Sequence, residues 1–324
     1  MASGRQDFAT GVVAQHYNQV EQRGIRERKK SAIIELRNFN NAMKSLLQYQ
    51  AIKFTNSSFP SREPLRVLDL GCGKGGDLPK YIYSGQVGLI VGVDIADVSI
   101  EQCIDRYKKH TMPRRPRGEF FVADLTRVDI GPKLKEHNCP EKFHIASSQF
   151  SIHYSFESLE QAIKYISNAA NNLQKHGVFI GTYPDGPKLL KLARLSADPG
   201  VYEVDDVLSV RFSPEDLKNP KPFGTKYHFK LKEVVDCPEF LTHPEILESV
   251  MTSLGFYKVF DRSFEEQIKE THKSPADKDK FKELFEKHKA LKFDFELGKA
   301  TLSETMWSVA SLYRCFCYRK LRDD

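Results

Sequence analysis

The chain has 324 residues, 40% of them hydrophobic and 11% aromatic, which is enough to bury a core in one large domain or two. Its formal net charge of +6 fits a polyanionic partner, although an ordinary solvated surface gives the same value. The sequence lacks both a run of about 18 apolar residues that could span a bilayer and an apolar secretory signal after Met1, so we expect an intracellular protein with no membrane contact.

The cysteines show neither a zinc nor a disulfide signature. They lie singly along the chain, without C-x-x-C spacing, at Cys72, Cys103, Cys139, Cys237, Cys315 and Cys317. We therefore predict no disulfide and no bound metal.

Residues 1–62 are predicted to form an N-terminal helical segment. Val12, Val13 and Tyr17 share one helical face. Apolar residues then recur at helical spacing, at Ile33, Leu36, Met43 and Leu47. The pattern predicts two or three helices, and the turn-rich residues 56–61 end the segment.

Residues 63–184 alternate apolar runs with helical stretches. The runs predict strands at 65–70, 89–95, 120–123, 143–150 and 178–182, and the stretches predict helices at 75–83, 98–110 and 158–173. In the third helix the predicted buried face holds Leu159, Ala162, Ile163, Ile166, Ala169 and Leu173. Lys175-His176-Gly177 is predicted to close it. This order predicts a parallel sheet with helices on both faces.

After Pro184 the alternation breaks. Residues 185–264 predict a helix near Leu189, several short strands that form a substrate-binding insertion, and a return to the sheet with a helix at 246–254 and a strand at 256–264. A charged, mobile excursion is expected at 265–300, with one amphipathic helix carrying Phe281, Leu284, Phe285, His288 and Leu291. A last strand at 309–318, within the C-terminal segment 301–324, completes one catalytic domain over residues 1–324.

A glycine-rich turn follows the first predicted strand. The string Leu68-Asp-Leu-Gly-Cys-Gly-Lys-Gly-Gly-Asp77 lets a cofactor approach the backbone closely. It also satisfies G-x-G-x-x-G, so a nicotinamide or flavin site is an alternative. Asp69, two residues before the first glycine, favours the D-x-G-x-G form of S-adenosylmethionine sites. The turn lacks the Gly-Lys-Ser/Thr ending of a phosphate-binding loop, which argues against ATP hydrolysis.

The next strands also end in polar residues. Asp94 follows about 20 residues later and suits the two ribose hydroxyls, a feature that dinucleotide sites share. Asp124 suits the adenine amino group, and Gln149 ends the fourth strand. All these strand ends meet at one crevice. The alternatives are that Asp69 only caps its own turn and that Asp124 only caps a helix.

Several further strings identify a family. They are Leu36-Arg-Asn-Phe-Asn-Asn-Ala-Met-Lys44, Asp94-Ile-Ala-Asp97, Gln149-Phe-Ser-Ile-His-Tyr-Ser-Phe-Glu157, Val234-Val-Asp-Cys-Pro-Glu-Phe-Leu241 and Ser311-Leu-Tyr313. Together with the glycine turn, they resemble the catalytic domain of eukaryotic mRNA cap guanine-N7 methyltransferases from His16 to the last strand. The resemblance implies a class I (Rossmann-like) S-adenosylmethionine methyltransferase with a mostly parallel seven-stranded sheet.

The resemblance also implies two sets of site residues. The cofactor set is Lys44, Gly71, Asp94, Asp124, Gln149 and Tyr154, to which the D-x-G-x-G form of the turn adds Asp69 and Gly73. The cap-binding set is Asn40, Asn41, Lys74, Lys80, Arg106, His153, Glu239 and Tyr313. The basic members are expected to face the triphosphate bridge.

The chemistry of guanine N7 explains why no catalytic acid or base is expected. N7 carries a lone pair and no proton, so aligning it with the methyl group and sulfur is what the site must do, and proximity of this kind lowers a barrier by about 7–11 kcal/mol. We expect Glu239, His153 and Tyr313 to position the guanine. Glu239 would also accept the guanine N1 and N2 hydrogens and stabilise the positive charge that methylation creates.

The expected partners follow from this substrate. We predict a monomeric nuclear enzyme that binds capped RNA, releases S-adenosylhomocysteine, and works with a small activating subunit or the transcription machinery. The basic clusters at 26–30 and 114–117, with Lys108 and Lys109, are candidate contacts for RNA beyond the cap, although the first equally suits a nuclear import signal or a solvated helix. The alternatives are a methyltransferase for another nucleic acid, a small molecule or a protein, and a non-catalytic cap-binding protein.

Overall fold

The computed structural model describes residues 8–19, 31–59, 63–139, 142–294 and 299–322. A seven-stranded sheet forms its centre, with strand order β10-β13-β5-β4-β1-β2-β3. The strands are β1 (Leu65–Leu70), β2 (Val87–Asp94), β3 (Arg117–Val122), β4 (Phe143–Gln149), β5 (Leu173–Pro184), β10 (Phe256–Ser263) and β13 (Tyr313–Lys320). Strand β13 is antiparallel to both of its neighbours, β10 and β5, and the other four pairs are parallel, so the prediction of a mostly parallel sheet is confirmed.

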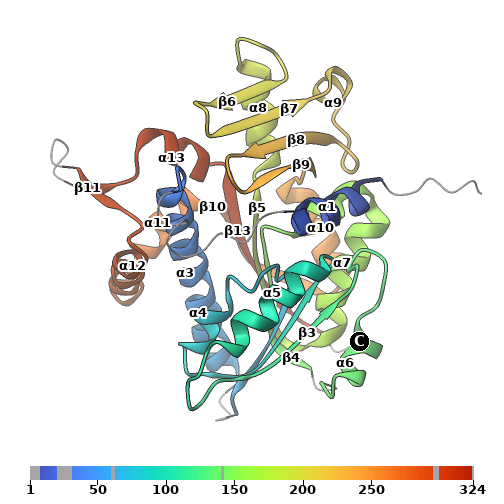
Figure 1. Ribbon diagram of the computed structural model, residues 1–324, viewed down its shortest axis with the longest axis vertical. Helices are drawn as coiled ribbons and strands as arrows, with labels where there is room; N and C mark the ends of the chain where they lie inside the picture. Colours follow the sequence, from blue (N-terminus) through green and yellow to red (C-terminus); the bar gives the residue numbers. More distant parts are fainter. Residues whose placement is uncertain (1–7, 20–30, 60–62, 140–141, 295–298, 323–324) are drawn as a thin grey trace, which may run out of the picture.

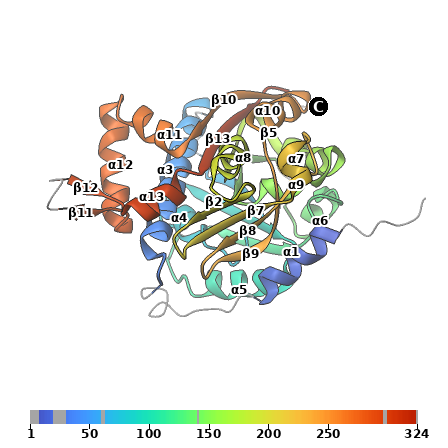
Figure 2. The same ribbon diagram turned by 90° about the horizontal axis from the view of Figure 1, so that it is seen from above.

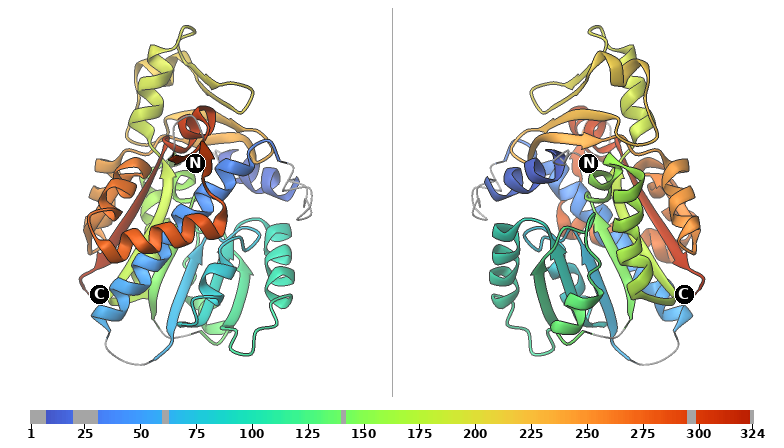
Figure 3. Two further views of the ribbon diagram at one scale, coloured as in Figure 1. Left: turned by 90° about the vertical axis from the view of Figure 1, so that its left-hand side faces the viewer. Right: turned by 90° about the vertical axis from the view of Figure 1, so that its right-hand side faces the viewer.

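The sheet is buried on both faces, as its continuous apolar strands require. Every residue of β4 is buried, and Val67, Leu68 and Leu70 of β1 are fully buried. One face is covered by α3 (Ile34–Ser58), α4 (Leu78–Ile82) and α5 (Asp97–Lys108). The other is covered by α6 (Gly131–Glu136), α7 (Leu159–Asn172) and α10 (Pro244–Ser253), as Figures 1 and 3 show.

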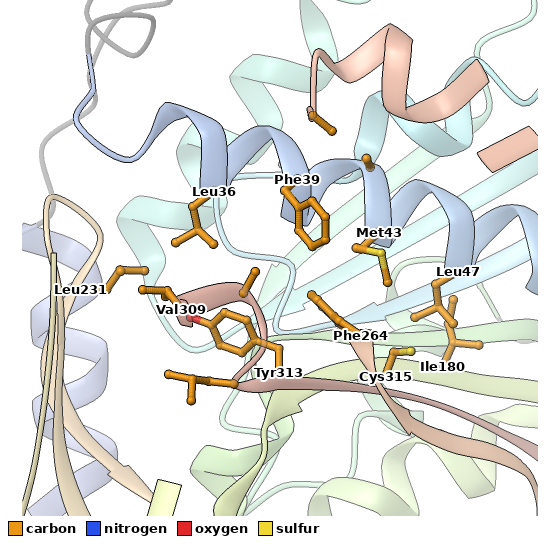
Figure 4. Packing of buried hydrophobic residues seen from close by; sticks show 14 of the residues in the cluster. Leu36, Phe39, Met43, Leu47, Ile180, Leu231, Phe264, Val309, Tyr313 and Cys315 are labelled. Carbon is orange, nitrogen blue, oxygen red and sulfur yellow. The ribbon is translucent and has the colours of Figure 1, made fainter. Parts of the chain in front are cut away.

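Helix α3 is the longest element that the structure describes, and it packs between the central sheet and α12. Its apolar residues Leu36, Phe39, Met43 and Leu47 recur every three or four positions and are all buried. Figure 4 shows them pointing at the sheet and at the neighbouring elements. Although α3 has 25 residues, neither it nor any other helix in the described ranges is long and apolar enough to cross a membrane.

A small second sheet stands over the carboxyl ends of the central strands, at the top of Figure 1. It is antiparallel, with the order β6-β7-β8-β9. Its strands are β6 (Val201–Val204), β7 (Leu208–Phe212), β8 (Lys226–Leu231) and β9 (Val235–Phe240). The same segment holds two helices, α8 (Gly186–Leu195) before β6 and α9 (Pro214–Lys218) between β7 and β8. Strand β8 alternates buried and exposed residues, as expected when only one face of a sheet is covered. Figure 2 shows α1 (Phe8–Gln19) between β9 and α5, both of which it contacts.

The segment after β10 differs from its prediction. It holds two helices, α11 (Phe264–Thr271) and α12 (Pro275–His288), where the sequence predicted one. A new helix starts at Ser274-Pro275, because proline is favoured in the first turn of a helix and disfavoured in its interior. Helix α12 packs on α3, with the Phe285 and Phe39 rings perpendicular and 5.5 Å apart. The short strands β11 (Lys292–Asp294) and β12 (Lys299–Thr301) then pair, and α13 (Glu304–Ala310) follows.

Three local predictions were wrong. Helix α7 ends at Asn172, so Lys175-His176-Gly177 belongs to β5. Four residues of β5 lie between Leu173 and Val178, where β4 has one residue between their partners Phe143 and Ile145. Leu159 and Ile163 are 48% and 37% exposed, because the buried face of α7 is centred on Ala162 and Ile166. The last strand begins at Tyr313 rather than at 309, because 304–310 form α13.

Candidate active site

A cavity of about 270 Å³ lies at the carboxyl ends of the central strands. Seven of the eight predicted cofactor residues line it: Lys44, Gly71, Gly73, Asp94, Asp124, Gln149 and Tyr154. They come from α3 and from the ends of four strands, where ligands bind in open α/β sheets. The structure thus brings together residues that span 110 positions of the sequence, from 44 to 154.

The glycine turn follows β1 in a conformation that other residues rarely adopt. Gly71 and Gly73 have φ angles of +75° and +50°. The amides of Gly71 and Cys72 both donate to the Val93 carbonyl, at 2.8 and 3.1 Å, which fixes the turn against β2. A Cβ on Gly71 would lie 2.0 Å from Ser151 Oγ. The turn therefore leaves no room for a side chain at Gly71.

Asp94 joins two loops and also faces the cavity. Its Oδ2 accepts a hydrogen bond from the Gly73 amide at 2.7 Å, and its Oδ1 accepts one from the Ala96 amide at 3.0 Å. Burial raises its pKa above the usual value, against the effect of these amides. Each oxygen keeps a lone pair, so the carboxylate can still accept two hydroxyl groups.

Asp124 lines the cavity while it caps its own turn. Its Oδ1 accepts from the Thr126 amide at 2.9 Å and from Thr126 Oγ1 at 2.6 Å, and its Oδ2 lies 3.2 Å from Arg127 Nε. Asp124 therefore caps a turn and not a helix, as the alternative had it, and a contact with adenine stays a prediction.

Asp69 is the predicted cofactor residue that does not line the cavity. It is 2% exposed and lies beneath the turn. Burial, and then the neighbouring Asp77 carboxylate, raise its pKa well above the usual value, against the effect of Lys44. Its position suits a support for the turn better than a ligand contact.

Asp77, to which the sequence assigned no role, binds two lysines. Its Oδ2 accepts from Lys44 Nζ at 3.0 Å, and its Oδ1 accepts from Lys80 Nζ at 2.6 Å. Lys80 also donates to Asn41 Oδ1 at 3.1 Å. Burial opposes the ionisation of Asp77, but the two ammonium groups outweigh it and hold its pKa well below the usual range. Burial lowers the pKa of Lys80 to about 8, despite Asp77.

Glu239 is 3% exposed and is held by two tyrosines. Its Oε2 accepts from Tyr227 at 2.9 Å, and its Oε1 accepts from Tyr154 at 3.3 Å. His153 Nε2 lies 3.3 Å from Oε1, but neither ring nitrogen of His153 has a hydrogen-bond partner in the described structure. The hydroxyl of Tyr154 is also 3.0 Å from that of Tyr17 on α1. Tyr154 therefore connects Glu239 to the cavity.

The other predicted cap residues do not share one cavity. Asn40 and Asn41 line a second cavity of about 450 Å³, which shares Lys44 and Phe150 with the first. The Tyr313 ring packs perpendicular to that of Phe150, with centroids 4.9 Å apart. Among the described residues, Lys74, Lys80 and Arg106 are not in the lining of either cavity.

Comparison with known proteins identifies the family. Residues 2–321 match the model of the mRNA (guanine-N(7))-methyltransferase domain. The mRNA cap guanine-N(7) methyltransferase of Caenorhabditis briggsae is 37% identical over 81% of this chain and 68% of that protein. The Drosophila melanogaster enzyme is 37% identical over 81% of this chain and 62% of that protein. The mRNA cap guanine-N(7) methyltransferase 1 of Oryza sativa subsp. japonica is 36% identical over 95% of this chain and 80% of that protein. The chain belongs to the mRNA (guanine-N7)-methyltransferase family.

Two solved structures place this family member in the class I methyltransferase fold. The plantazolicin methyltransferase BamL is 12% identical with a TM-score of 0.51, over 97% of this chain and 96% of its own. An S-adenosylmethionine-dependent methyltransferase from Clostridium acetobutylicum is 12% identical with a TM-score of 0.50, over 91% and 95%. These likenesses confirm the predicted fold class.

Of the two predicted basic clusters of this methyltransferase, only the second lies in the described part of the chain. Residues 26–30 lie outside the described residues. The 114–117 cluster leads into β3, which begins at Arg117, at the end of the sheet opposite the cavity. Arg115 Nη1 donates to the Tyr107 and His110 carbonyls, both at 2.9 Å, and its guanidinium stacks 4.0 Å above the Tyr107 ring. Arg115 therefore closes α5, and the structure gives it a role other than RNA binding.

Sequence reasoning missed three contributors to the methyltransferase site. Asp77 closes the glycine-turn string, and its acidic side chain was the available signal. Tyr17 lines the cavity from the predicted apolar face of α1. Tyr165 donates to the Leu70 carbonyl at 3.0 Å and contacts Ser151 Oγ at 2.6 Å, and no local pattern marks it.

Among the described residues, no group of three or more His, Cys, Asp or Glu side chains is arranged to hold a metal.

Proposed function

We propose that this protein transfers the methyl group of S-adenosylmethionine to N7 of the 5′ cap guanine of mRNA, converting GpppN-RNA to 7-methyl-GpppN-RNA and S-adenosylhomocysteine. The observation that carries the proposal is the convergence of seven predicted cofactor residues on one cavity in a chain of this family. Glu239, which suits a guanine, is one hydrogen bond away from that cavity through Tyr154.

The residues that line the cavity fit S-adenosylmethionine. Gly71 and Gly73 expose backbone to a ligand, and we assign the ribose hydroxyls to Asp94 and the adenine amino group to Asp124. Lys44 Nζ is 3.0 Å from Asp77 and faces the cavity, so it can pair with the methionine carboxylate without losing its buried anchor. When bound, the cofactor supplies a methyl group that its sulfonium already activates, so the proposed reaction requires no metal.

The protein's own residues act by position and charge. Glu239 is buried, and its two tyrosine partners fix its orientation. In this water-poor site its carboxylate accepts the guanine N1 and N2 hydrogens, and the attraction grows as methylation makes the ring positive. Because the interaction is stronger in the transition state than in the ground state, it accelerates transfer. His153 and Tyr313 limit the space around the ring, and no group needs to remove a proton.

The finer assignments complete the proposal. Lys74, Lys80 and Arg106 attract the triphosphate bridge, with Lys80 held beside Asn41 by Asp77. Capped transcripts arise in the nucleus, where we place the enzyme. It acts there as a monomer, with a small activating subunit or the transcription machinery as partner.

The direct test is transfer of labelled methyl to GpppG-capped RNA, with ApppG-capped and uncapped RNA as controls and nuclease mapping of the product. We expect 7-methylguanine from the first substrate alone. Methylation elsewhere, or none while S-adenosylhomocysteine binds, would overturn the proposed substrate. Glu239→Gln should lower kcat/KM for capped RNA about 10²-fold, as the loss of a transition-state contact does, and leave S-adenosylhomocysteine affinity unchanged. The exposed Glu245→Gln is the matched control, because the Glu245 side chain is 83% exposed.

A further inference from the structure

The second cavity has features that the cofactor and the cap guanine do not use. It lies between the first half of α3 and the turn that joins β8 to β9, and its volume is about 450 Å³. Seven of its eleven lining residues have no part in the site described so far, among them Arg37, Asn38, Leu231 and Val234. The cavity is comparable in size to the one that the predicted cofactor residues line. It is therefore large enough for a substantial part of the substrate.

Its walls combine apolar and amide surfaces. Ile34 on α3 and Leu231 and Val234 on the hairpin supply the apolar part, and Phe150 adds an aromatic ring. Three asparagines on one stretch of α3 supply amides: Asn38, Asn40 and Asn41. A ligand with a flat apolar face and polar edges matches such walls, as a nucleoside does.

The polar groups leave hydrogen-bonding capacity in the cavity. Asn40 Oδ1 is buried and has no hydrogen-bond partner within the described structure. An unpartnered buried acceptor is costly, so a donor from a ligand, such as a ribose hydroxyl or an exocyclic amine, would stabilise it. Arg37 Nη2 donates to the Glu233 carbonyl at 3.3 Å and ties α3 to the β8–β9 turn. This hydrogen bond joins the two walls of the cavity.

The connection between the two cavities carries positive charge. Lys44 lines both cavities, and Lys80 donates to Asn41 in the second. Both ammonium groups donate to the same carboxylate, that of Asp77. A polyanionic linker that runs from one cavity to the other would pass both lysines, and phosphate is the anion that lysines commonly bind.

We infer that the second cavity is the binding site for the nucleoside that follows the triphosphate bridge, the first transcribed nucleoside of the RNA. This inference rests on the proposed function and deepens it. The guanosine to be methylated lies beside the cofactor, the bridge passes Lys44, and the next nucleoside lies between α3 and the β8–β9 turn. The substrate is therefore held at both ends of its bridge.

The test compares two methyl acceptors that differ only in this nucleoside. GpppG has it and GTP lacks it, so the ratio of their kcat/KM values reports occupation of the second cavity. Val234→Trp fills the cavity from the hairpin and Ile34→Trp fills it from α3, and each should lower the GpppG-to-GTP ratio about tenfold. Val259→Trp, at a 36% exposed position on β10, is the matched control and should keep the ratio.

The outcomes separate the inference from the function on which it rests. If the wild type methylates GpppG but prefers it no more than GTP, or if both tryptophan variants keep the wild-type ratio, the second site is wrong and the proposed reaction stands. If the wild type binds S-adenosylhomocysteine but methylates neither acceptor nor capped RNA, the proposed function fails and the inference fails with it. Thermal melting checks that each variant folds, and the two walls give independent variants if one does not.

Discussion

The two glycines of the turn should respond differently to the same substitution. Both have positive φ angles, +75° at Gly71 and +50° at Gly73, so alanine at either position costs about 1–2 kcal/mol in backbone strain. At Gly73 the added Cβ meets nothing within 4 Å. At Gly71 it lies 2.0 Å from Ser151 Oγ and 2.6 Å from Ser151 Cβ, so a rotation of the serine cannot relieve the overlap.

Overpacking of this kind costs about 1–3 kcal/mol. Moving Ser151 also breaks its hydrogen bonds to the Leu70 carbonyl at 3.3 Å and to Tyr165 at 2.6 Å. We therefore expect the free energy of unfolding to fall by about 2–5 kcal/mol in Gly71→Ala and by about 1–2 kcal/mol in Gly73→Ala.

Urea unfolding without ligand measures both values, because the single tryptophan, Trp307, packs edge-on against Phe39 of α3 at 5.9 Å and reports loss of the core. Ser151→Gly removes the atoms that overlap. In that background, Gly71→Ala should cost only the backbone strain, about 1–2 kcal/mol. Equal losses at the two glycines, or a Gly71→Ala cost that does not change when Ser151 is glycine, would refute the reasoning.

Two further predictions concern charged residues. Burial lowers the pKa of Lys80 from 10.5 to about 8, so between these pH values the unfolded state holds more protons and stability rises with pH. The wild type should therefore gain stability relative to Lys80→Met between pH 8 and 10, and a constant difference in urea unfolding would contradict this. Arg115→Ala should cost about 1–2 kcal/mol, because it loses the bonds that close α5 and the stacking on Tyr107. The salt dependence of RNA binding should not change, and a flatter slope would restore Arg115 as a phosphate contact.

The parts of the site that could be predicted are those that local sequence determines. A strand, a glycine turn and a helix follow one another along the chain, so the positions of Gly71 and Gly73 followed from the string itself. Asp94 could be placed because parallel strands end at the same edge of a sheet. The family resemblance added Lys44, Gln149 and Tyr154, and all three line the cavity.

The parts that could not be predicted depend on contacts between distant elements. Asp77 acquires its role because α3 brings Lys44 within 3.0 Å of it, 33 positions away in sequence. Glu239 is held by Tyr154, which is 85 positions away. No spacing rule encodes these approaches, since the packing of whole elements decides them. The second helix after β10 is a different case, because Ser274-Pro275 was a local helix-start signal that the charged composition masked.

The position of β13 has a consequence for the synthesis of the protein. This strand lies between β5 and β10, and it is translated after both of them. Until it emerges from the ribosome, β5 and β10 each present an unpaired edge that β13 will later cover, and an exposed edge is where strands of other chains can add. The central sheet can therefore be completed only after β13 has been translated, and the growing chain keeps these two edges uncovered over the interval between β10 and β13.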